Sequence, residues 1–488
     1  MKRIGYLIII AMVFFLGMAF EQSRLSSIVE EGAAFVVKST RQQVREIADL
    51  DTRTQILLEN PRLLSRIALG GGFGGEYSVL AAKNMFSRLP NVVEDIKNKT
   101  EIIEIAERTY LIRLPIVNVI LFETDEGNVL VDTGMAPAGP AIYESIRKIN
   151  DLPIHSVIYT HGHVDHAYGT WAIIENGETP EIIAHKNLSK RFTRYIRLRG
   201  SIAKYMSQPE EQLPTSEKDF TWPTKEFENR LELDIGGETF VLQHHPGETD
   251  DQLYVWAPSR RILASADYYQ GFLPNAGNGK RIQRDVEGWA KALREMAKLN
   301  ATILLPSHGT PIIGPKEINT NLSTLADALE FIVEHTIRGL NAGLRKDEIA
   351  ASLSLPDHLA QHPTLEVQYV NPEDISKMVL KKYTGWWDDI PSHWSPAPIS
   401  MQGEMIISLA NQNIPRIIKQ GRELIEKDLR LASHLADWLF YARPRNKLVQ
   451  DYVHDVYKAR ILSPSSNTME MLTYLDQMAR AREVAAEN

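Results

Sequence analysis

The sequence has 488 residues, of which 43% are hydrophobic and 24% charged, and this is the composition of an ordinary globular protein. Its length exceeds what one hydrophobic core usually serves, which predicts two or three domains. The formal net charge of −8 argues against a nucleic-acid-binding protein, and the absence of cysteine excludes disulfides and thiolate metal ligands.

The N-terminus has the layout of a secretory signal. Lys2 and Arg3 precede an apolar run, Ile4–Phe20, and the pair Gly17 and Ala19 suits cleavage after Ala19. The run is also near the lower limit for a membrane span, so an uncleaved anchor is the alternative. We therefore expect an exported protein, periplasmic or extracellular, with residues 1–20 either removed or kept as an anchor.

The pattern of the sequence changes twice along the rest of the chain. Residues 21–95 are predicted to form a helical N-terminal extension, and residues 96–315 alternate short β-rich runs with helical segments, which indicates an α/β domain. After residue 315 no run is typical of a strand, so 316–488 are expected to form a helical domain. The β-rich runs are Thr109–Arg113, Val117–Glu123, Val129–Asp132, Ser156–Tyr159, Glu181–Ala184, Thr239–Gln243, Leu253–Trp256 and Ile303–Pro306.

Four candidate metal ligands lie within six residues, directly after the apolar run 157–159. They are His161, His163, Asp165 and His166. A loop at the end of a strand can turn several side chains toward one point. Because the chain has no thiol, imidazole and carboxylate are the ligands we expect for a zinc ion.

Three later segments repeat the pattern of a candidate ligand after an apolar run. Asp267 ends the run 262–266, His308 follows the run 304–306, and Glu248 follows the run 239–243 after two histidines. Asp250 and Asp251 compete with Glu248 for the ligand role. His244 and His245 lie too early in their segment, so at most one is expected to hydrogen-bond a ligand, and simple packing is equally compatible.

The order of these motifs resembles the metallo-β-lactamase superfamily: His-x-His-x-Asp-His, then Pro-Gly-Glu, then a strand-end Asp and a strand-end His. The earlier segment Val131-Asp132-Thr133-Gly134 is similar to a motif near the start of that superfamily's domain. The resemblance implies an αββα sandwich with two adjacent zinc ions, iron or manganese being the alternatives, and an Asp132 that orients the metal loop. It also implies catalytic roles for Asp165 and Asp267. The implied first-ion ligands are His161, His163 and Glu248, the second-ion ligands are Asp165, His166 and His308, and Asp267 bridges.

Other stretches resemble the alkylsulfatase branch of that superfamily. Arg199–Met206 looks like its insertion, while Leu325–Leu344 and Tyr383–Asp388 are similar to its helical dimerisation domain. A glutamate at position 248 is also characteristic of the branch. The resemblance implies a homodimer formed through residues 316–488, and no sterol-carrier-like domain is expected after them.

The sequence departs from the branch at the bridging position, where Asp267 stands in place of the usual glutamate. The sulfate-binding Asn and Arg of the branch would fall on Asn275 and Lys280, and Arg281 or Arg284 could supply the planar fork that Lys280 lacks. Six basic residues also precede or enter the insertion, either as a solvated helix face or as an attraction for an anionic group. They are Lys190, Arg191, Arg194, Arg197, Arg199 and Lys204.

These features predict a hydrolase that cleaves alkyl sulfate esters to alcohol and sulfate with metal-activated water, attacking at carbon as the resemblance implies. A hydrolase of another ester, thioester, lactone or phosphoester is the first alternative, and a non-enzymatic metal-stabilised binding protein is the second. The expected partner is a small anionic ester, without nucleic acid, and membrane contact is expected only through residues 1–20. Trp386, Trp387 and Trp394 either line an apolar channel or pack between domains.

Overall fold

The computed structural model describes residues 52–60, 62–63, 66, 90–114, 116–206 and 210–486. The chain forms two compact units, Tyr77–Trp386 and a second one made of Met1–Glu76 with Trp387–Asn488. The expected signal or anchor at residues 1–20 and most of the expected extension at 21–95 lie outside the described residues. Within the described part of the chain, none of the helices combines the length and apolar character that a bilayer span needs.

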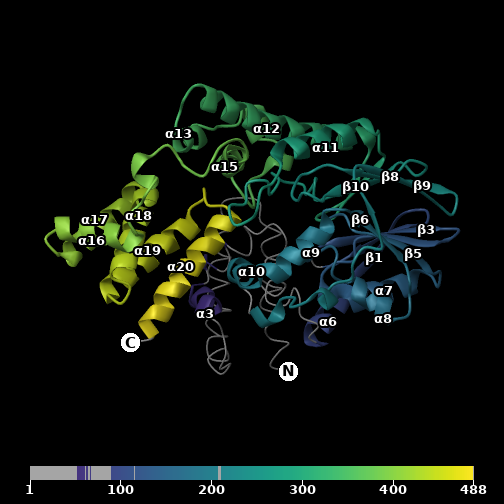
Figure 1. The fold of residues 1–488 in the computed structure, drawn as a ribbon, viewed down its shortest axis with the longest axis horizontal. Coiled ribbons are helices and arrows are strands. Elements are labelled where there is room, and N and C mark those ends of the chain that lie inside the picture. The colour runs from purple at the N-terminus through teal and green to yellow at the C-terminus, as the bar shows by residue number, and fades with distance from the viewer. Residues whose placement is uncertain are drawn as a thin grey trace, which may run out of the picture. The chain divides into compact units, whose positions relative to one another are not determined.

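The larger unit contains two β-sheets that lie face to face (Figure 1). In the first sheet the strands follow chain order, antiparallel from β1 to β4 and parallel from β4 to β7. Its strands are β1 (Glu101–Ala106), β2 (Thr109–Arg113), β3 (Asn118–Thr124), β4 (Gly127–Val131), β5 (Ile154–Ile158), β6 (Glu181–His185) and β7 (Lys225–Phe227).

The second sheet has six strands in the order β13-β12-β11-β10-β9-β8. Only the pair β11 and β12 is parallel, so the ends of these two strands reach the same edge of the sheet. Its strands are β8 (Arg230–Ile235), β9 (Glu238–His244), β10 (Leu253–Ala257), β11 (Ile262–Ala266), β12 (Ile303–Pro306) and β13 (Ile312–Ile313).

Strand β3 shows how one sequence serves both faces of the first sheet. Side chains alternate along a strand, so Ile120 and Phe122 point into the core between the sheets, while Val119 and Leu121 join the core on the opposite face. Phe122 packs edge-on against Phe240 of the second sheet, with ring centroids 5.3 Å apart. Truncating either buried ring to alanine would cost about 3–5 kcal/mol.

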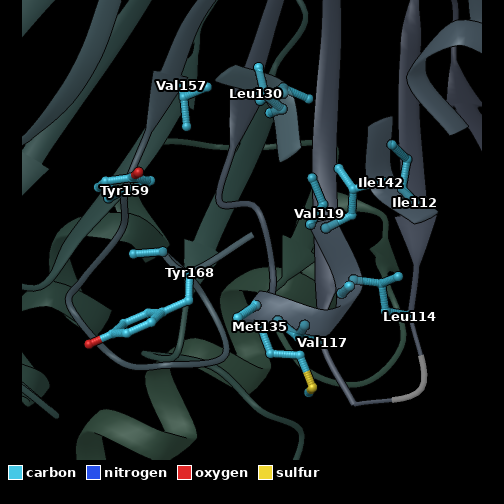
Figure 2. Close-up of a cluster of buried hydrophobic side chains, with 14 of the residues drawn as sticks. Ile112, Leu114, Val117, Val119, Leu130, Met135, Ile142, Val157, Tyr159 and Tyr168 are labelled. Carbon is cyan, nitrogen blue, oxygen red and sulfur yellow. The ribbon is translucent and has the colours of Figure 1, made fainter. Parts of the chain in front are cut away.

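Helices cover the outer faces of both sheets (Figure 1). Helices α7 (Gly139–Ile149), α8 (Thr170–Glu175) and α9 (Leu188–Arg197) contribute to the core on the first sheet (Figure 2). Helices α11 (Val286–Lys298) and α12 (Pro315–Asn341) lie beyond the second sheet. This is an αββα sandwich, which confirms the expected fold class.

Among its described residues, the larger unit includes five further α-helices. Helix α12 packs against both α11 and α15, so the helices after residue 315 continue the layer outside the second sheet. The domain boundaries expected from the sequence stay predictions. The further helices are α6 (Pro90–Lys97), α10 (Arg199–Met206), α13 (Lys346–Ala351), α14 (Asp357–Ala360) and α15 (Pro372–Tyr383).

The regular elements among the described residues of the smaller unit are all helices, joined by loops and turns. Asp428 and Asn446 cap two of its helices by accepting backbone N–H groups, which accounts for those boundaries. Gly403 allows α16 to approach the Trp438 carbonyl of α18 closely. The helices are α3 (Thr52–Glu59), α16 (Ile399–Leu409), α17 (Ile414–Lys427), α18 (Leu429–Ala442), α19 (Lys447–Leu462) and α20 (Thr468–Ala486).

Candidate metal centre

The loop that follows β5 brings two imidazoles together. His161 Nε2 and His163 Nδ1 lie 2.9 Å apart. Glu248, from the loop between β9 and β10, completes a group whose three ligand atoms all lie within 4.8 Å of one another. His161 and Glu248 are buried and His163 is half-buried, so these groups face one enclosed point.

A second group forms beside the first from three chain segments. His166 Nε2 lies 3.5 Å from Asp165 Oδ2, and His308 Nε2 lies 3.4 Å from the same carboxylate oxygen. His308 comes from the end of β12, while the other two residues come from the loop after β5. These three residues also satisfy the spacing of a metal site.

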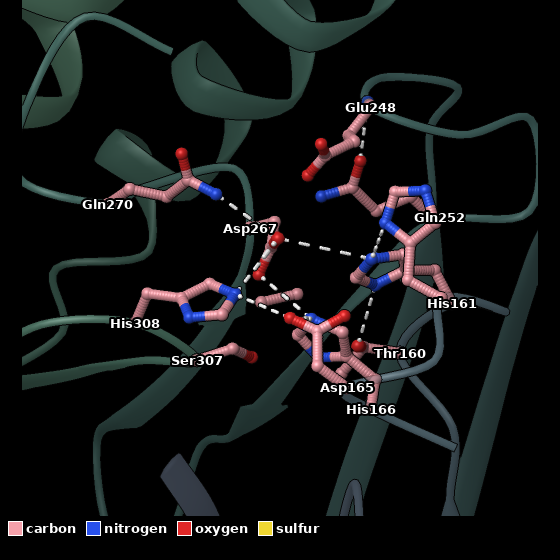
Figure 3. A network of polar contacts seen from close by, with 12 residues as sticks. Thr160, His161, Asp165, His166, Glu248, Gln252, Asp267, Gln270, Ser307 and His308 are labelled. Atoms are coloured by element: carbon pink, nitrogen blue, oxygen red, sulfur yellow. Dashed lines mark hydrogen bonds and ion pairs between the residues drawn. The ribbon is translucent and has the colours of Figure 1, made fainter. Parts of the chain in front are cut away.

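Asp267 lies between the two groups (Figure 3). Its carboxylate oxygens are 3.9 Å from His161 Nε2, 3.5 Å from His166 Nε2 and 3.3 Å from His308 Nε2. Gln270 Nε2 donates a hydrogen bond of 3.1 Å to the same carboxylate. All seven residues expected as ligands therefore meet at one edge of the two sheets, and Asp267 lies between the other six.

The donor set fits divalent cations. Nitrogen and carboxylate oxygen ligands suit zinc in a chain without cysteine. Three of the buried atoms, His166 Nε2, Glu248 Oε2 and Asp267 Oδ1, have no hydrogen-bond partner among the described residues. Buried polar atoms normally have a partner, so lone pairs left over at one point are what metal coordination requires.

Asp132 orients the loop that carries four of the ligands. Its carboxylate accepts hydrogen bonds of 2.7 Å from both the backbone N–H and the hydroxyl of Thr160. It also lies 2.9 Å from His166 Nδ1, which leaves Nε2 of that ring directed at the site. Such a contact fixes the tautomer and orientation of a metal-binding imidazole.

Backbone strain marks the strand ends that present the site. Asp132 and Ala266 adopt left-handed conformations with φ of 63° and 50°. An alanine in this region costs about 1 kcal/mol or more, and such strain concentrates at functional sites. The turn at Ala266 also coincides with a register shift between β11 and β12, and Asp267 follows it directly.

Asn118 ties the first sheet to the segment that carries His308. Its side-chain amide donates to the carbonyls of Pro306 and Gly309, and its backbone N–H donates to Ser307. His308 Nδ1 lies 2.8 Å from the carbonyl oxygen of Ile116, so its Nε2 faces the site. The position of this ligand therefore depends on both sheets.

Charge and burial act in opposite directions on the imidazoles. Burial lowers the pKa of His161 and His163 well below the usual value, which keeps them neutral and able to bind a cation. Burial also disfavours the charged form of His308, but the Asp267 and Asp165 carboxylates raise its pKa to about 9. The carboxylates thus create a strongly negative site that favours positive charge.

Glu248 is held from behind by a buried arginine. Arg284 Nη1 donates to Glu248 Oε1, and both side chains are almost fully buried. Burial raises the pKa of Glu248 to about 7, although Arg284 opposes this shift. From the sequence, Arg284 is a candidate only for binding the substrate, since nothing in the local pattern reveals a contact with a residue 36 positions away.

The residues that competed with Glu248 lie elsewhere. Asp251 accepts the backbone N–H of Gly162 at 2.8 Å and forms an ion pair with Arg191, and Asp250 pairs with the same arginine. Neither aspartate belongs to a metal-binding group among the described residues. Asp251 therefore supports the metal loop, a role that the sequence analysis did not assign to it.

The two histidines before Glu248 also take no place in those groups. His244 stacks on His185 with centroids 3.7 Å apart, and its Nδ1 lies 2.8 Å from the Gln252 carbonyl oxygen. His245 Nε2 lies 2.6 Å from Glu295 of helix α11. His244 thus packs against the first sheet and His245 against helix α11, which agrees with the packing alternative given for them.

A pocket lined by cationic side chains opens beside the first group of ligands. Four arginines, two tyrosines and two isoleucines line it with two of the ligands. A concave site of this kind can hold a small ligand whose head is anionic. The lining residues are His163, Arg191, Arg194, Tyr195, Ile202, Tyr205, Glu248, Arg281, Ile282 and Arg284.

Of the residues expected to bind substrate, Arg281 lines this cavity, and its guanidinium lies 5.1 Å from the centre of the Tyr205 ring. Asn275 and Lys280 are not part of the lining. Arg191 and Arg194 of the basic stretch do line it, whereas Arg197 is exposed. The three-residue spacing on α9 therefore places two of the cations on the cavity side.

The tryptophan loop is largely outside this arrangement. Trp386 and Trp394 are 75% and 65% exposed, and neither lines the cavity. Trp387 packs edge-on against Trp394, with centroids 5.7 Å apart. The apolar channel expected from these residues stays a prediction.

Comparisons with known proteins match this geometry. Residues 112–308 match the family model "Metallo-beta-lactamase superfamily", and residues 345–483 match "Alkyl sulfatase dimerisation". A linear primary-alkylsulfatase from a Pseudomonas species is 27% identical over 358 residues, which cover 68% of each chain. An alkyl/aryl-sulfatase from Saccharomyces cerevisiae is 24% identical, and the match covers 72% of this chain and 59% of that protein.

Among solved structures, the sec-alkylsulfatase Pisa1 from Pseudomonas sp. superposes with a TM-score of 0.70 at 20% identity. The match covers 86% of this chain and 68% of that one, and at this identity it shows the shared fold alone. The sandwich and its strand-end ligands define a metallo-β-lactamase superfamily domain with a divalent-metal site. With the dimerisation segment that follows, the chain has the domain organisation of the alkylsulfatase-like branch of that superfamily.

Proposed function

We propose that this protein hydrolyses alkyl sulfate esters to an alcohol and inorganic sulfate, using two zinc ions. One observation carries the proposal, namely that a complete set of seven buried or half-buried ligands adjoins a cavity lined by four arginines. One ion would be held by His161, His163 and Glu248. The other would be held by Asp165, His166 and His308. Asp267 would bridge, and the related alkylsulfatases support the substrate class.

The bound cations would supply a nucleophile near neutral pH by lowering the pKa of water. The chain's own residues would orient the ester, with Arg281 drawing the sulfate group toward the metal ligands. In the overall reaction an alkyl sulfate and water give an alcohol and hydrogen sulfate. Asn275 and Lys280 remain proposed contacts of the sulfate oxygens, and the carboxylates of Asp165 and Asp267 keep the ligand set anionic.

The bond that breaks can be identified with labelled water. Sulfate is a weak base, so it leaves carbon readily, and we propose attack at carbon with cleavage of the C–O bond. Hydrolysis in ¹⁸O water should then place the label in the alcohol, as measured by mass spectrometry. Label recovered in sulfate would contradict attack at carbon.

Metal analysis combined with a substrate panel tests the proposed activity. We expect about two zinc ions per chain, loss of activity after chelation, and recovery on adding zinc. Primary and secondary alkyl sulfates should turn over faster than thioesters, lactones or phosphate monoesters of matched chain length. Faster hydrolysis of a thioester or phosphoester by the zinc-loaded protein would favour the alternative hydrolase instead.

Two further proposals concern the whole protein. A homodimer through the helical segment is supported by the match to the alkyl sulfatase dimerisation model. Export is supported by the charged and apolar layout of residues 1–20. Cell fractionation tests the second proposal, and recovery of the protein in the cytoplasm would contradict it.

A further inference from the structure

We propose that the four arginines of the cavity divide into two pairs with different tasks. Arg191 and Arg284 are positioning residues for the metal site, whereas Arg194 and Arg281 bind the anionic group of the ligand. All four line the same space, but their partners differ. The second half of this division rests on the proposed function, and the first half does not.

Arg284 is committed to Glu248. Its Nη1 donates to Glu248 Oε1, and the side chains are only 2% and 4% exposed. The other carboxylate oxygen, Oε2, has no hydrogen-bond partner among the described residues. The arginine therefore fixes one oxygen of the carboxylate and leaves the other without a protein partner, as a one-oxygen metal ligand requires.

Arg191 acts on the metal loop through Asp251. Its Nε lies 2.8 Å from Asp251 Oδ1, and Asp251 Oδ2 accepts the N–H of Gly162 at 2.8 Å. Gly162 separates the ligands His161 and His163 in the chain. A Cβ at Gly162 would lie 3.2 Å from Arg191 Cβ, so the arginine also packs against the loop it supports.

These contacts leave little of either positive charge for a ligand. Arg284 is offset by Glu248, and Arg191 is offset by Asp250 and Asp251. A buried guanidinium that lost its carboxylate partner would carry an uncompensated charge, which is strongly unfavourable. Releasing either arginine to bind substrate would therefore cost the organisation of the metal site.

Arg194 and Arg281 have no carboxylate partner among the described residues. Arg194 Nη2 contacts the Tyr205 hydroxyl at 3.2 Å, and the Arg281 guanidinium lies over the ring of the same tyrosine. Tyr205 thus holds two cations from different segments, α9 and the loop before α11, around one side of the cavity. Two guanidinium groups that lack a compensating carboxylate form a site for a sulfate-type anion.

Metal affinity tests the positioning pair without reference to activity. R191Q, D251N and R284Q should each bind zinc about 10- to 100-fold more weakly than the original protein, in competition with a chromogenic chelator. R284K keeps the charge and should recover part of the loss, which a merely structural role would not predict. Circular dichroism and the melting temperature identify a variant that has failed to fold. If R284Q has failed to fold, the zinc affinity of R284K tests the role of Arg284 instead.

Anion binding tests the other pair. An alkyl sulfonate is a suitable probe, because its C–S bond is not an ester and binding is separated from turnover. R194Q and R281Q should weaken its binding to the zinc-loaded protein by at least about tenfold in calorimetry, with zinc affinity unchanged. R197Q is the matched control on the same helix, and its binding should stay within about twofold.

The outcomes separate the two proposals. The division would be overturned if R191Q and R284Q bound zinc as tightly as the original protein. It would also be overturned if R194Q and R281Q lost as much zinc affinity as R191Q and R284Q do. A sulfonate that binds through Arg194 and Arg281 to a protein inactive on alkyl sulfates would contradict the proposed function alone. If the protein is active, R194Q and R281Q should raise KM by a larger factor than they lower kcat. A larger effect on kcat than on KM would also overturn the division.

Discussion

Asp132 is the residue on which the orientation of the metal loop depends most directly. It is fully buried, and its two oxygens serve Thr160 and His166 together. Ser307, next to His308, also contacts it at 3.4 Å. One carboxylate therefore links the loop after β5 with the end of β12, which explains why ligands from two sheets converge.

Replacing this carboxylate with an amide should weaken metal binding. In D132N, the new NH₂ group would face donors of Thr160 and His166, so the imidazole would lose its fixed orientation. We expect zinc affinity to fall about 10- to 100-fold, as measured by competition with a chelator. D437N is the control, because Asp437 accepts a hydrogen bond from Tyr457 in the other unit. Equal zinc affinity in D132N would contradict the role of Asp132.

At the scale of secondary-structure elements, the site depends on how closely segments approach. Gly169 begins the turn into α8, and a Cβ there would lie 1.9 Å from the Thr133 carbonyl oxygen. The same segments are joined by the hydrogen bond from Thr133 N to His166 O. The position of a metal ligand is therefore coupled to the packing of a helix that contributes no ligand.

Alanine at Gly169 should disturb both stability and metal binding. Because backbone must move, we expect G169A to lose about 1–3 kcal/mol of unfolding free energy, together with zinc affinity. G403A is the matched control, since its Cβ would lie 1.9 Å from the Trp438 carbonyl oxygen in the smaller unit. G403A should lose stability but keep its zinc affinity. A loss of zinc affinity in G403A would show that the effect of G169A on zinc binding is not specific to the site. Urea unfolding and zinc titration provide the two measurements.

The stacked pair of His185 and His244 joins β6 of one sheet to β9 of the other. Burial and His244 lower the pKa of His185 to about 4, and Glu228, Asp250 and Lys186 also face the ring. The unfolded imidazole titrates near 6.5, so between pH 6.5 and 4 the unfolded chain binds more protons than the folded chain. Acidification through this window should therefore remove stability.

A glutamine at His185 should reduce that pH dependence. We expect metal-free H185Q to lose about 1–2 kcal/mol less stability than the parent between pH 7 and pH 4.5. Metal-free protein is used so that release of zinc does not contribute, and urea unfolding at the two pH values gives the difference. H358Q, at an exposed histidine of α14, should behave as the parent does. If the stability of H185Q fell with pH as steeply as that of the parent, His185 would not be the source of the pH dependence.

At the scale of the whole molecule, α16 presents an apolar row within the segment that matches the dimerisation model. Met401, Met405 and Leu409 are 61%, 56% and 76% exposed in the single chain. Their four-residue spacing places them on one helix face. An exposed apolar row of this kind is typical of a protein–protein contact, which agrees with the proposed homodimer.

Light scattering tests that proposal. The protein should be a dimer at micromolar concentration, and L409E should shift it toward monomer, because a charge would be desolvated in the contact. I174E on α8 is the control, since Ile174 is 40% exposed but lies outside the matched segment. A monomeric parent protein would contradict the homodimer, and a dimeric L409E would exclude α16 as the contact.

The fold and the ligands could be predicted because their signals are local. Eight β-rich runs each correspond to a strand, since buried strands are short apolar runs between turn residues. Strands β1, β7, β8 and β13 were not predicted. Strand β1 has no buried residue and β8 carries exposed charged residues, while β7 and β13 have only three and two residues. The cluster from His161 to His166 is visible within six residues.

The sequence by itself therefore determined the type of site, because the imidazoles and carboxylates expected to bind metal follow strands whose pattern is local. Only the tertiary structure decided what surrounds them. The contact of Arg284 with Glu248 and that of Asp251 with Gly162 span 36 and 89 positions. Such contacts depend on how packed sheets and helices bring distant segments together, and no spacing in the chain specifies that.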